Sequence, residues 1–153
     1  MVALGVFVGC VVLVACSGAV FKPDAWYRGL SKPAWNPPDW AFGSAWSVLY
    51  VMIAVAGWRV WERAESDALL PAMVVYAIQL ALNAGWSAVF FGLKRPDWAL
   101  AKLACLWTAI LLNIMVFYPI DPVAGWLLAP YLLWVMFAGA LNLAVWRLNR
   151  SEA

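Results

Sequence analysis

Charged residues are absent from five long stretches of this chain. These uncharged runs cover 108 of the 153 residues, measure 20, 19, 26, 18 and 25 residues, and are 2–21, 40–58, 68–93, 103–120 and 122–146. A helix needs about 20 apolar residues to cross a hydrocarbon core of roughly 30 Å. Strands of a membrane barrel would alternate polar and apolar residues over about ten positions, whereas these runs are apolar on every face. The sequence therefore predicts an all-α integral membrane bundle of five transmembrane helices.

The composition excludes several classes of protein. Hydrophobic residues make up 67% of the chain and charged residues 12%, which disfavours both a cytosolic enzyme and a disordered chain. The net charge of +2 is too small and too dispersed for a nucleic-acid-binding surface. Histidine is absent, which removes Ser-His catalysis, Cys-His catalysis and the zinc motifs that need imidazole. We therefore expect neither a metal site nor a resident cofactor.

We expect one domain over residues 1–153 and can predict how it is oriented. Its spans are predicted near 2–21, 41–61, 68–92, 98–118 and 122–147, with a long loop rich in aromatic residues and proline over 22–40. Eight basic residues fall on one side of this arrangement: Lys22, Arg28, Lys32, Lys94, Arg95, Lys102, Arg147 and Arg150. The other side holds Arg59 and Arg63. Because basic residues collect on the cytoplasmic side, we expect the C-terminus in the cytoplasm and the N-terminus outside a bacterial cell membrane.

The first span has an alternative interpretation. Residues 13–16 resemble the lipid-attachment box of a bacterial lipoprotein signal, but a signal peptide begins with a basic region and the first basic side chain here is Lys22.

The three cysteines, Cys10, Cys16 and Cys105, lie within predicted spans without a C-x-x-C spacing. We therefore expect them to be buried as small apolar residues.

The 22–40 loop combines stiffness with aromatic rings. Its four prolines favour extended or turn conformations, and its rings prefer a boundary between apolar and aqueous surroundings. These rings are Trp26, Tyr27, Trp35 and Trp40. Two interpretations fit: an interfacial aromatic belt, and a stiff aromatic lid over the bundle.

Three spans carry polar and aromatic side chains at helical spacing. The stripes are Phe42, Trp46 and Tyr50; Gln79, Asn83, Trp86 and Phe90; and Tyr131, Trp134, Ala138 and Asn142. If they converge, they enclose an aromatic cavity edged by amides and hydroxyls, which suits a flat apolar ligand. Alternatively, these side chains only bind one helix to another.

A second face of the third span predicts a contact between two copies of the chain. Ala77, Ala81 and Gly85 repeat as small-xxx-small, about 200° around the helix from the polar stripe. Gly5 and Gly9 in the first span form an alternative contact. We therefore expect a homodimer.

Several separated motifs follow one another in a fixed order from about Phe21 to Arg147. They are Trp35-Asn36-Pro37-Pro38, Trp46, Asn83-x-x-Trp86-x-x-x-Phe90-Phe91, and Pro130-Tyr131-x-x-Trp134 through Leu141-Asn142. Together with the five-span layout, they resemble the tryptophan-rich sensory protein family, also called the translocator protein or peripheral-type benzodiazepine receptor family.

The resemblance implies a five-helix bundle, usually dimeric, that binds porphyrins such as protoporphyrin IX and, in animal members, sterols and benzodiazepine-site drugs. The ligand-contacting positions that it implies here are Tyr27, Trp46, Tyr50, Asn83, Trp86, Cys105, Trp134 and Ala138. Some bacterial members break down protoporphyrin in light, and the two tryptophans implicated resemble Trp46 and Trp134. Leu143 replaces the tyrosine of the family's sterol motif, which disfavours sterol recognition.

Three functions are compatible with these residues. We favour a receptor or sensor for tetrapyrroles, in which Lys22, Arg28 or Lys32 pairs with the ligand's carboxylates or, alternatively, with lipid headgroups. The porphyrin would be a ligand, accepted without its metal, with Cys or Met ligation of iron as the alternative. The second function is light- and oxygen-dependent porphyrin degradation, and the third is transport. All eight acidic residues lie outside the five runs, which weakens proton-coupled transport.

Overall fold

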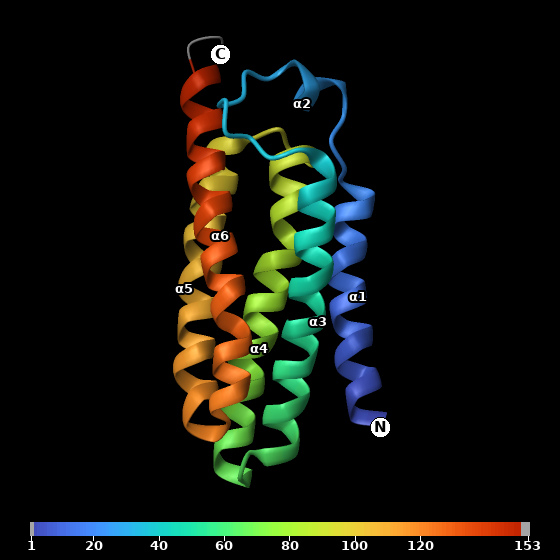
Figure 1. Ribbon diagram of the computed structural model, residues 1–153, viewed down its shortest axis with the longest axis vertical. Coiled ribbons are helices and arrows are strands. Elements are labelled where there is room, and N and C mark those ends of the chain that lie inside the picture. The colour runs from blue at the N-terminus through green and yellow to red at the C-terminus, as the bar shows by residue number, and fades with distance from the viewer. Residues whose placement is uncertain (1, 151–153) are drawn as a thin grey trace.

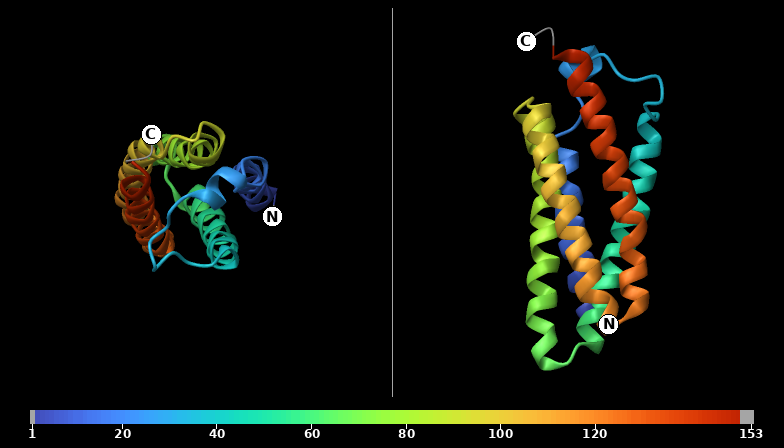
Figure 2. Two further views of the ribbon diagram at one scale, coloured as in Figure 1. Left: turned by 90° about the horizontal axis from the view of Figure 1, so that it is seen from above. Right: turned by 90° about the vertical axis from the view of Figure 1, so that its left-hand side faces the viewer.

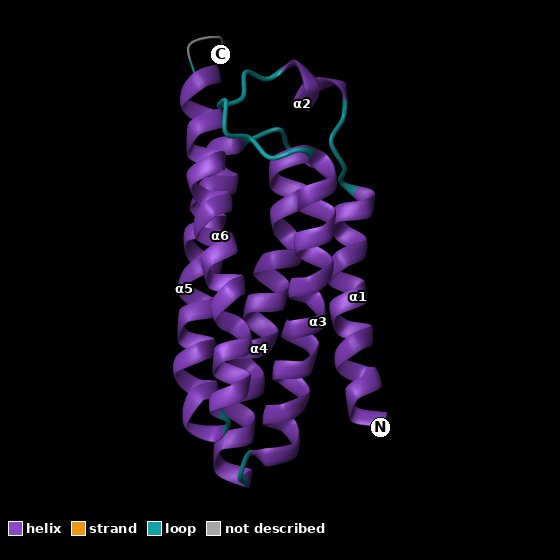
Figure 3. Cartoon of the chain, viewed as in Figure 1, coloured by secondary structure: helices purple, strands orange, loops and turns teal. Residues whose placement is uncertain are grey.

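The computed structural model describes residues 2–150 and confirms the all-α membrane bundle. Five helices are long and apolar enough to cross a membrane: α1 (Val2–Val20), α3 (Asp39–Arg63), α4 (Ser66–Ser87) continued by the π-helical turn η1 (Ala88–Gly92), α5 (Pro96–Ile120) and α6 (Pro122–Asn149). A short helix, α2 (Ala25–Gly29), lies in the loop between α1 and α3 (Figure 1). Over the described residues the chain is helix and loop, without strands (Figure 3).

Helix α2 corrects the prediction that the 22–40 loop is only extended or turn. The prolines of the loop flank this helix rather than interrupt it, so its turn remains free to form. The Asp24 carboxylate begins the helix by accepting a hydrogen bond from the Tyr27 backbone N–H, at 3.1 Å. A proline-rich loop can therefore hold one helical turn when a capping residue and a proline-free stretch occur together.

The five long helices form a closed ring in the order α1, α3, α6, α5 and α4 (Figures 1 and 2). The hairpin partners α3 and α4 are not neighbours in this ring, and they touch each other less than either touches the helices beside it. The centre is filled by apolar side chains such as Ile53, Ile110 and Leu128, which are fully buried.

The outer surface is apolar, as contact with lipid requires. Large apolar side chains such as Leu13, Leu70 and Leu133 are exposed there. Cys10, Cys16 and Cys105 are exposed as well, so the expectation that they would be buried was wrong. In a membrane, lipid is as apolar as the core, and the apolar character of a cysteine does not decide which way it faces.

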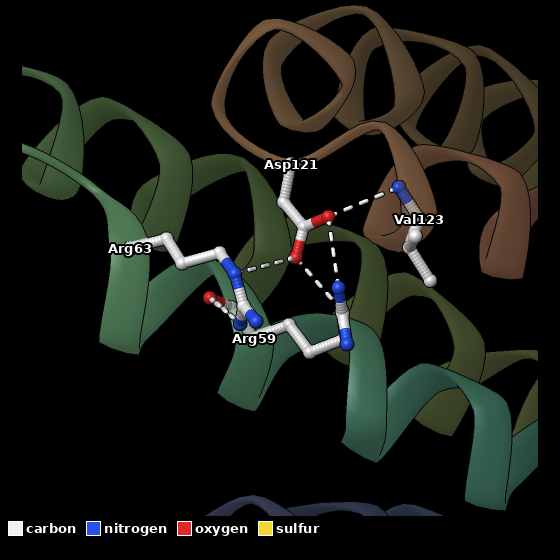
Figure 4. A network of polar contacts seen from close by, with 4 residues as sticks. All are labelled: Arg59, Arg63, Asp121 and Val123. Carbon is white, nitrogen blue, oxygen red and sulfur yellow. Dashed lines mark hydrogen bonds and ion pairs between the residues drawn. The ribbon is translucent and has the colours of Figure 1, made fainter.

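The two ends of the bundle differ in charge. Helix α2 and the C-terminal end of α6 lie at one end, and the first residues of α1 lie towards the other (Figure 1). At the end away from the loop, the Asp121 carboxylate lies between α3 and α6 (Figure 4). It accepts hydrogen bonds from Nε of Arg59 at 2.7 Å and from the backbone N–H of Val123 at 3.0 Å. Arg63 Nε lies 3.4 Å from it.

This carboxylate serves both as a helix cap and as an ion-pair partner. Burial raises the pKa of Asp121, but the hydrogen bonds from Arg59 and Val123 and the two guanidinium charges outweigh that effect and hold the pKa below its usual value. Asp121 is only 4% exposed, so it stays ionised because these partners replace water. The two basic residues of this end are therefore both engaged by one acid.

Candidate functional site

A cavity of about 750 Å³ lies among the helices beneath the long loop. Residues of all five long helices and of the loop line it. Its walls are mainly apolar, and its polar groups gather at the loop end and at the floor. A volume of this size is typical of small-molecule sites, which range over roughly 300–1,000 Å³.

Helix α3 supplies an aromatic wall. Phe42, Trp46 and Tyr50 are spaced by four residues, so they share one helical face, and all three line the cavity. The rings of Trp46 and Tyr50 lie 5.3 Å apart at an angle of 30° and pack against each other, which fixes their positions in the cavity wall. This wall can stack against a planar ligand.

Tyr50 and Asn83 form the floor of the cavity, and a chain of hydrogen bonds begins there. The Tyr50 hydroxyl donates to Oδ1 of Asn83 at 3.2 Å, and Nδ2 of Asn83 donates to the Tyr131 hydroxyl at 2.6 Å. Tyr131 in turn donates to Oε1 of Gln79 at 3.1 Å. Because the proton of Tyr50 is committed to Asn83, the lone pairs of the Tyr50 oxygen remain as acceptors for a ligand.

Helix α2 brings Tyr27 over the cavity. The Tyr27 ring packs edge-on against Phe90 and Phe91, with centroids 6.0 and 5.3 Å away. The π-helical turn η1 widens the helix there, so these two consecutive phenylalanines both meet the loop. Burial, and then the nearby Asp39 charge, raises the pKa of Tyr27, which keeps its hydroxyl neutral.

Polar contacts hold the loop against the bundle. The Asn149 side chain at the end of α6 pairs with the backbone of Ser31 in both directions, each hydrogen bond being 2.9 Å long. Nζ of Lys94 lies 3.2 Å from the Asp24 carboxylate. The Tyr27 N–H hydrogen bond lowers the pKa of Asp24 and Lys94 lowers it further, against the raising effect of desolvation. The lid interpretation of the loop therefore has a structural basis.

The loop end of the cavity is positively charged. Lys22, Arg28 and Lys32 line it together with one acid, Asp39. Nζ of Lys32 donates to the Tyr27 carbonyl at 2.7 Å and lies 4.4 Å from the centroid of the Tyr27 ring, so its position is fixed. The cavity thus has an acceptor-bearing floor, an aromatic wall and a cationic mouth.

Six of the eight predicted ligand-contacting residues line this cavity: Tyr27, Trp46, Tyr50, Asn83, Trp86 and Ala138. The aromatic rings of the loop fit both interpretations. Trp26 and Tyr27 pack inward against Phe90, as in a lid. Trp35 and Trp40 are exposed, as in an aromatic belt.

Trp134 and Cys105 differ from the prediction. Cys105 faces outward from α5 and lies outside the cavity lining of the described chain. Trp134 lies one layer behind the wall, with its ring edge-on to Phe42 at 5.7 Å. Helical spacing fixes which residues share a face, but the rotation of α5 and α6 in the bundle decides which of them reach the cavity.

Other predicted polar residues serve helix packing. Gln79 and Asn142 are buried outside the cavity lining, and Nδ2 of Asn142 donates to the Pro96 carbonyl at 2.8 Å. Sequence reasoning missed the contribution of α1, which supplies Ala15 and Gly18. Small residues in an apolar helix carry no distinguishing signal, so these two could not be found from the sequence.

The proposed contact between copies is only partly open. Ala77 and Ala81 are exposed on α4, as a helix–helix contact requires. At Gly85, however, Nζ of Lys102 lies 2.5 Å from the position that a Cβ atom would take, so α5 covers this part of the stripe. A Cβ atom at Gly5 or Gly9 would meet no atom of another part of residues 2–150 within 4 Å.

Comparison with known proteins places this fold and cavity in a family. The model of the TspO/MBR family matches residues 6–147, a range that includes every residue lining the cavity. The chain belongs to the TspO/MBR family.

Relatives of this TspO/MBR chain occur in bacteria and animals. The tryptophan-rich sensory protein of Cereibacter sphaeroides is 43% identical over 141 residues, which cover 91% of this chain and 87% of that protein. Protein CrtK of Rhodobacter capsulatus is 40% identical over 147 residues, covering 95% and 91%. The Homo sapiens translocator protein is 39% identical over 129 residues, covering 82% and 76%. The resemblance inferred from the motifs is therefore confirmed.

Proposed function

We propose that this protein is a membrane receptor or sensor that binds a tetrapyrrole of the protoporphyrin IX type in the cavity beneath the loop. The observation that carries the proposal is the combination, in one cavity, of the Trp46–Tyr50 wall with a mouth lined by Lys22, Arg28 and Lys32. A porphyrin is a wide planar ring that bears two carboxylates. Its ring stacks on the wall, and its carboxylates reach the basic side chains.

We propose that the macrocycle binds without a metal, because residues 1–153 include no histidine to ligate iron. The porphyrin is a ligand in this proposal and is not a resident cofactor. Sterols and benzodiazepine-site drugs are further candidate ligands for the same apolar cavity, and their ability to displace the porphyrin tests them.

The two other functions have less support. Light-dependent degradation through Trp46 and Trp134 needs both indoles near the ligand, and Trp134 stands behind Phe42. Transport needs a route from the cavity to the other end of the bundle, where Ile53, Ile110 and Leu128 fill the core. Receptor binding requires only the cavity.

A porphyrin titration tests the proposal. Protoporphyrin IX added to the purified protein in detergent should quench its tryptophan fluorescence. The substitution Trp46→Ala should weaken binding about tenfold, because it removes a stacking surface worth roughly 1.5 kcal/mol. Trp98→Ala is the matched control, since Trp98 is 63% exposed on α5 and lies away from the cavity lining, and its affinity should not change. Equal affinities for the two variants would refute the site.

The cationic mouth has its own test. Protoporphyrin IX should bind more tightly than its dimethyl ester, and Arg28→Gln should reduce that difference, because Arg28 lines the mouth and is exposed. Equal affinity of the parent protein for the diacid and for the dimethyl ester would show that the basic side chains do not bind the ligand's carboxylates.

We also propose an orientation and an assembly. The basic end of the bundle faces the cytoplasm, with the C-terminus inside and the N-terminus outside, because basic residues gather at that end. A reporter enzyme fused to the C-terminus and active only outside the cytoplasm should be silent.

The protein forms a homodimer through Ala77 and Ala81, and Ala81→Leu should shift its mass in detergent towards that of a monomer.

A further inference from the structure

Two buried amide side chains in the middle of the bundle have atoms without hydrogen-bond partners among the described residues. Nε2 of Gln79 on α4, and both Oδ1 and Nδ2 of Asn113 on α5, are unpaired among the described residues 2–150. Both side chains are 0% exposed. An unsatisfied buried polar group costs about 1–3 kcal/mol, so three such atoms in one layer require an explanation.

The register of the two helices places these amides opposite each other. Helices α4 and α5 are antiparallel neighbours, and the Tyr76 ring stacks on the Phe117 ring with centroids 5.9 Å apart. One helical turn towards the loop, α4 presents Gln79 and α5 presents Asn113 on the same buried faces. At the far end of the same interface Lys102 covers Gly85, which fixes the pairing at both ends.

The chemistry of the unpaired atoms is complementary. Gln79 already accepts from Tyr131 with Oε1, so its free atom is a donor, whereas Asn113 offers an acceptor and a donor. The two side chains do not hydrogen bond to each other directly, although the alignment of α4 and α5 places both in one buried layer. Buried donors and acceptors in one layer that still need partners suit a bridging water.

We propose that a buried water molecule binds between Gln79 and Asn113 and completes a hydrogen-bond chain that begins at the cavity floor. The water accepts from Nε2 of Gln79 and donates to Oδ1 of Asn113. The chain then runs from Tyr50 through Asn83, Tyr131 and Gln79 to the water, with every donor pointing away from the cavity. The site is distinct from the ligand cavity, whose lining includes neither amide, and it does not depend on the proposed ligand.

A buried layer without water and a layer with a bound water predict opposite effects of one substitution. If the layer is dry, Asn113→Leu removes two unsatisfied atoms and should stabilise the protein. If the water is bound, the same change leaves Nε2 of Gln79 without a hydrogen-bond partner. The midpoint of thermal unfolding should then fall by roughly 2–4 °C. Thr108→Leu is the matched control on α5, because Thr108 is exposed and its hydroxyl bonds to its own helix. Its midpoint should not fall.

Nuclear magnetic resonance of the unmodified protein provides a test that does not depend on a variant folding. The side-chain amide protons of Gln79 and Asn113 should exchange magnetisation with a long-lived water, and Asn113→Leu should abolish the Gln79 signal. Asn113→Ser should retain it, since a hydroxyl still offers an acceptor. Absence of the signal from both amides in the unmodified protein would overturn the proposal, and so would an Asn113→Leu variant more stable than the parent.

Discussion

Gly57 is a residue at which helices α1, α3 and α4 approach one another closely. A Cβ atom there would lie 2.6 Å from Cζ of Tyr76 on α4 and 2.8 Å from Cδ1 of Phe7 on α1. Tyr76 cannot easily retreat, because its hydroxyl donates to the Ile53 carbonyl at 3.1 Å and its ring stacks on Phe117. A hydrogen atom in place of a side chain therefore lets α1 and α4 pack on α3.

We predict that Gly57→Ala destabilises the protein by about 1–3 kcal/mol through overpacking, measured as a lower midpoint of thermal unfolding in detergent. Gly9→Ala is the control, because its Cβ would meet no atom of the described chain within 4 Å. Alanine favours a helix over glycine by up to about 1 kcal/mol, so this variant should match or exceed the parent. Equal midpoints for both variants would contradict the packing argument.

At the scale of elements, the loop is attached to the bundle at two places, Tyr27 and Ser31. Near its start, η1 presents Phe90 and Phe91 to Tyr27. Further along, the Asn149 side chain of α6 donates a hydrogen bond to the Ser31 carbonyl and accepts one from the Ser31 backbone N–H. These contacts connect the lid to two helices that are distant in sequence.

We predict that Asn149→Ala loosens the lid without unfolding the bundle. Loss of the Asn149 acceptor should speed hydrogen exchange of the Ser31 amide by up to about tenfold, in line with a hydrogen bond worth roughly 0.5–1.5 kcal/mol. Leu148→Ala is the control at the same exposed end of α6. Should Ser31 exchange at the parental rate in the Asn149 variant, the lid is held by the aromatic contacts alone.

For the molecule as a whole, the cavity end is held together mainly by aromatic and hydrogen-bond contacts, with an exposed ion pair between Lys94 and Asp24, and the opposite end by a buried carboxylate paired with two arginines. There, Asp121 joins α3 to the first turn of α6 through Arg59 and Arg63 (Figure 4). The pKa of Asp121 is lower in the folded protein than in the unfolded chain. Its contribution to stability is therefore fully present above the unfolded value of about 3.9, and is lost as the pH falls through the folded pKa.

We predict that Asp121→Asn lowers the free energy of unfolding by about 1.5–3 kcal/mol at pH 7, the range for hydrogen bonds to charged groups. The gap between parent and variant should shrink as the pH is lowered past 3.9, because the parent then becomes protonated. Glu62→Gln, at an exposed site near the same end of α3, is the control and should change little. A gap that persists undiminished in acid would rule out the ionic mechanism.

The candidate site was partly predictable. Spacing by four residues placed Phe42, Trp46 and Tyr50 on one face of a helix, and they do form one wall. The same reasoning failed for Trp134, since spacing along α6 does not reveal its rotation relative to Phe42. Membrane helices are apolar on all sides, so the pattern that identifies the buried face of a soluble helix is weak here.

The sequence by itself determined the number of membrane-spanning helices, their approximate lengths and the end of the bundle at which basic residues gather. Those features follow from the free-energy cost of placing charge in hydrocarbon, which each residue meets independently of its neighbours. Only the tertiary structure decided that the helices form a closed ring, that Asn83 connects Tyr50 to Tyr131, and that Cys105 faces lipid. These depend on how helices rotate and pack against one another, which is governed by contacts between residues far apart in the chain.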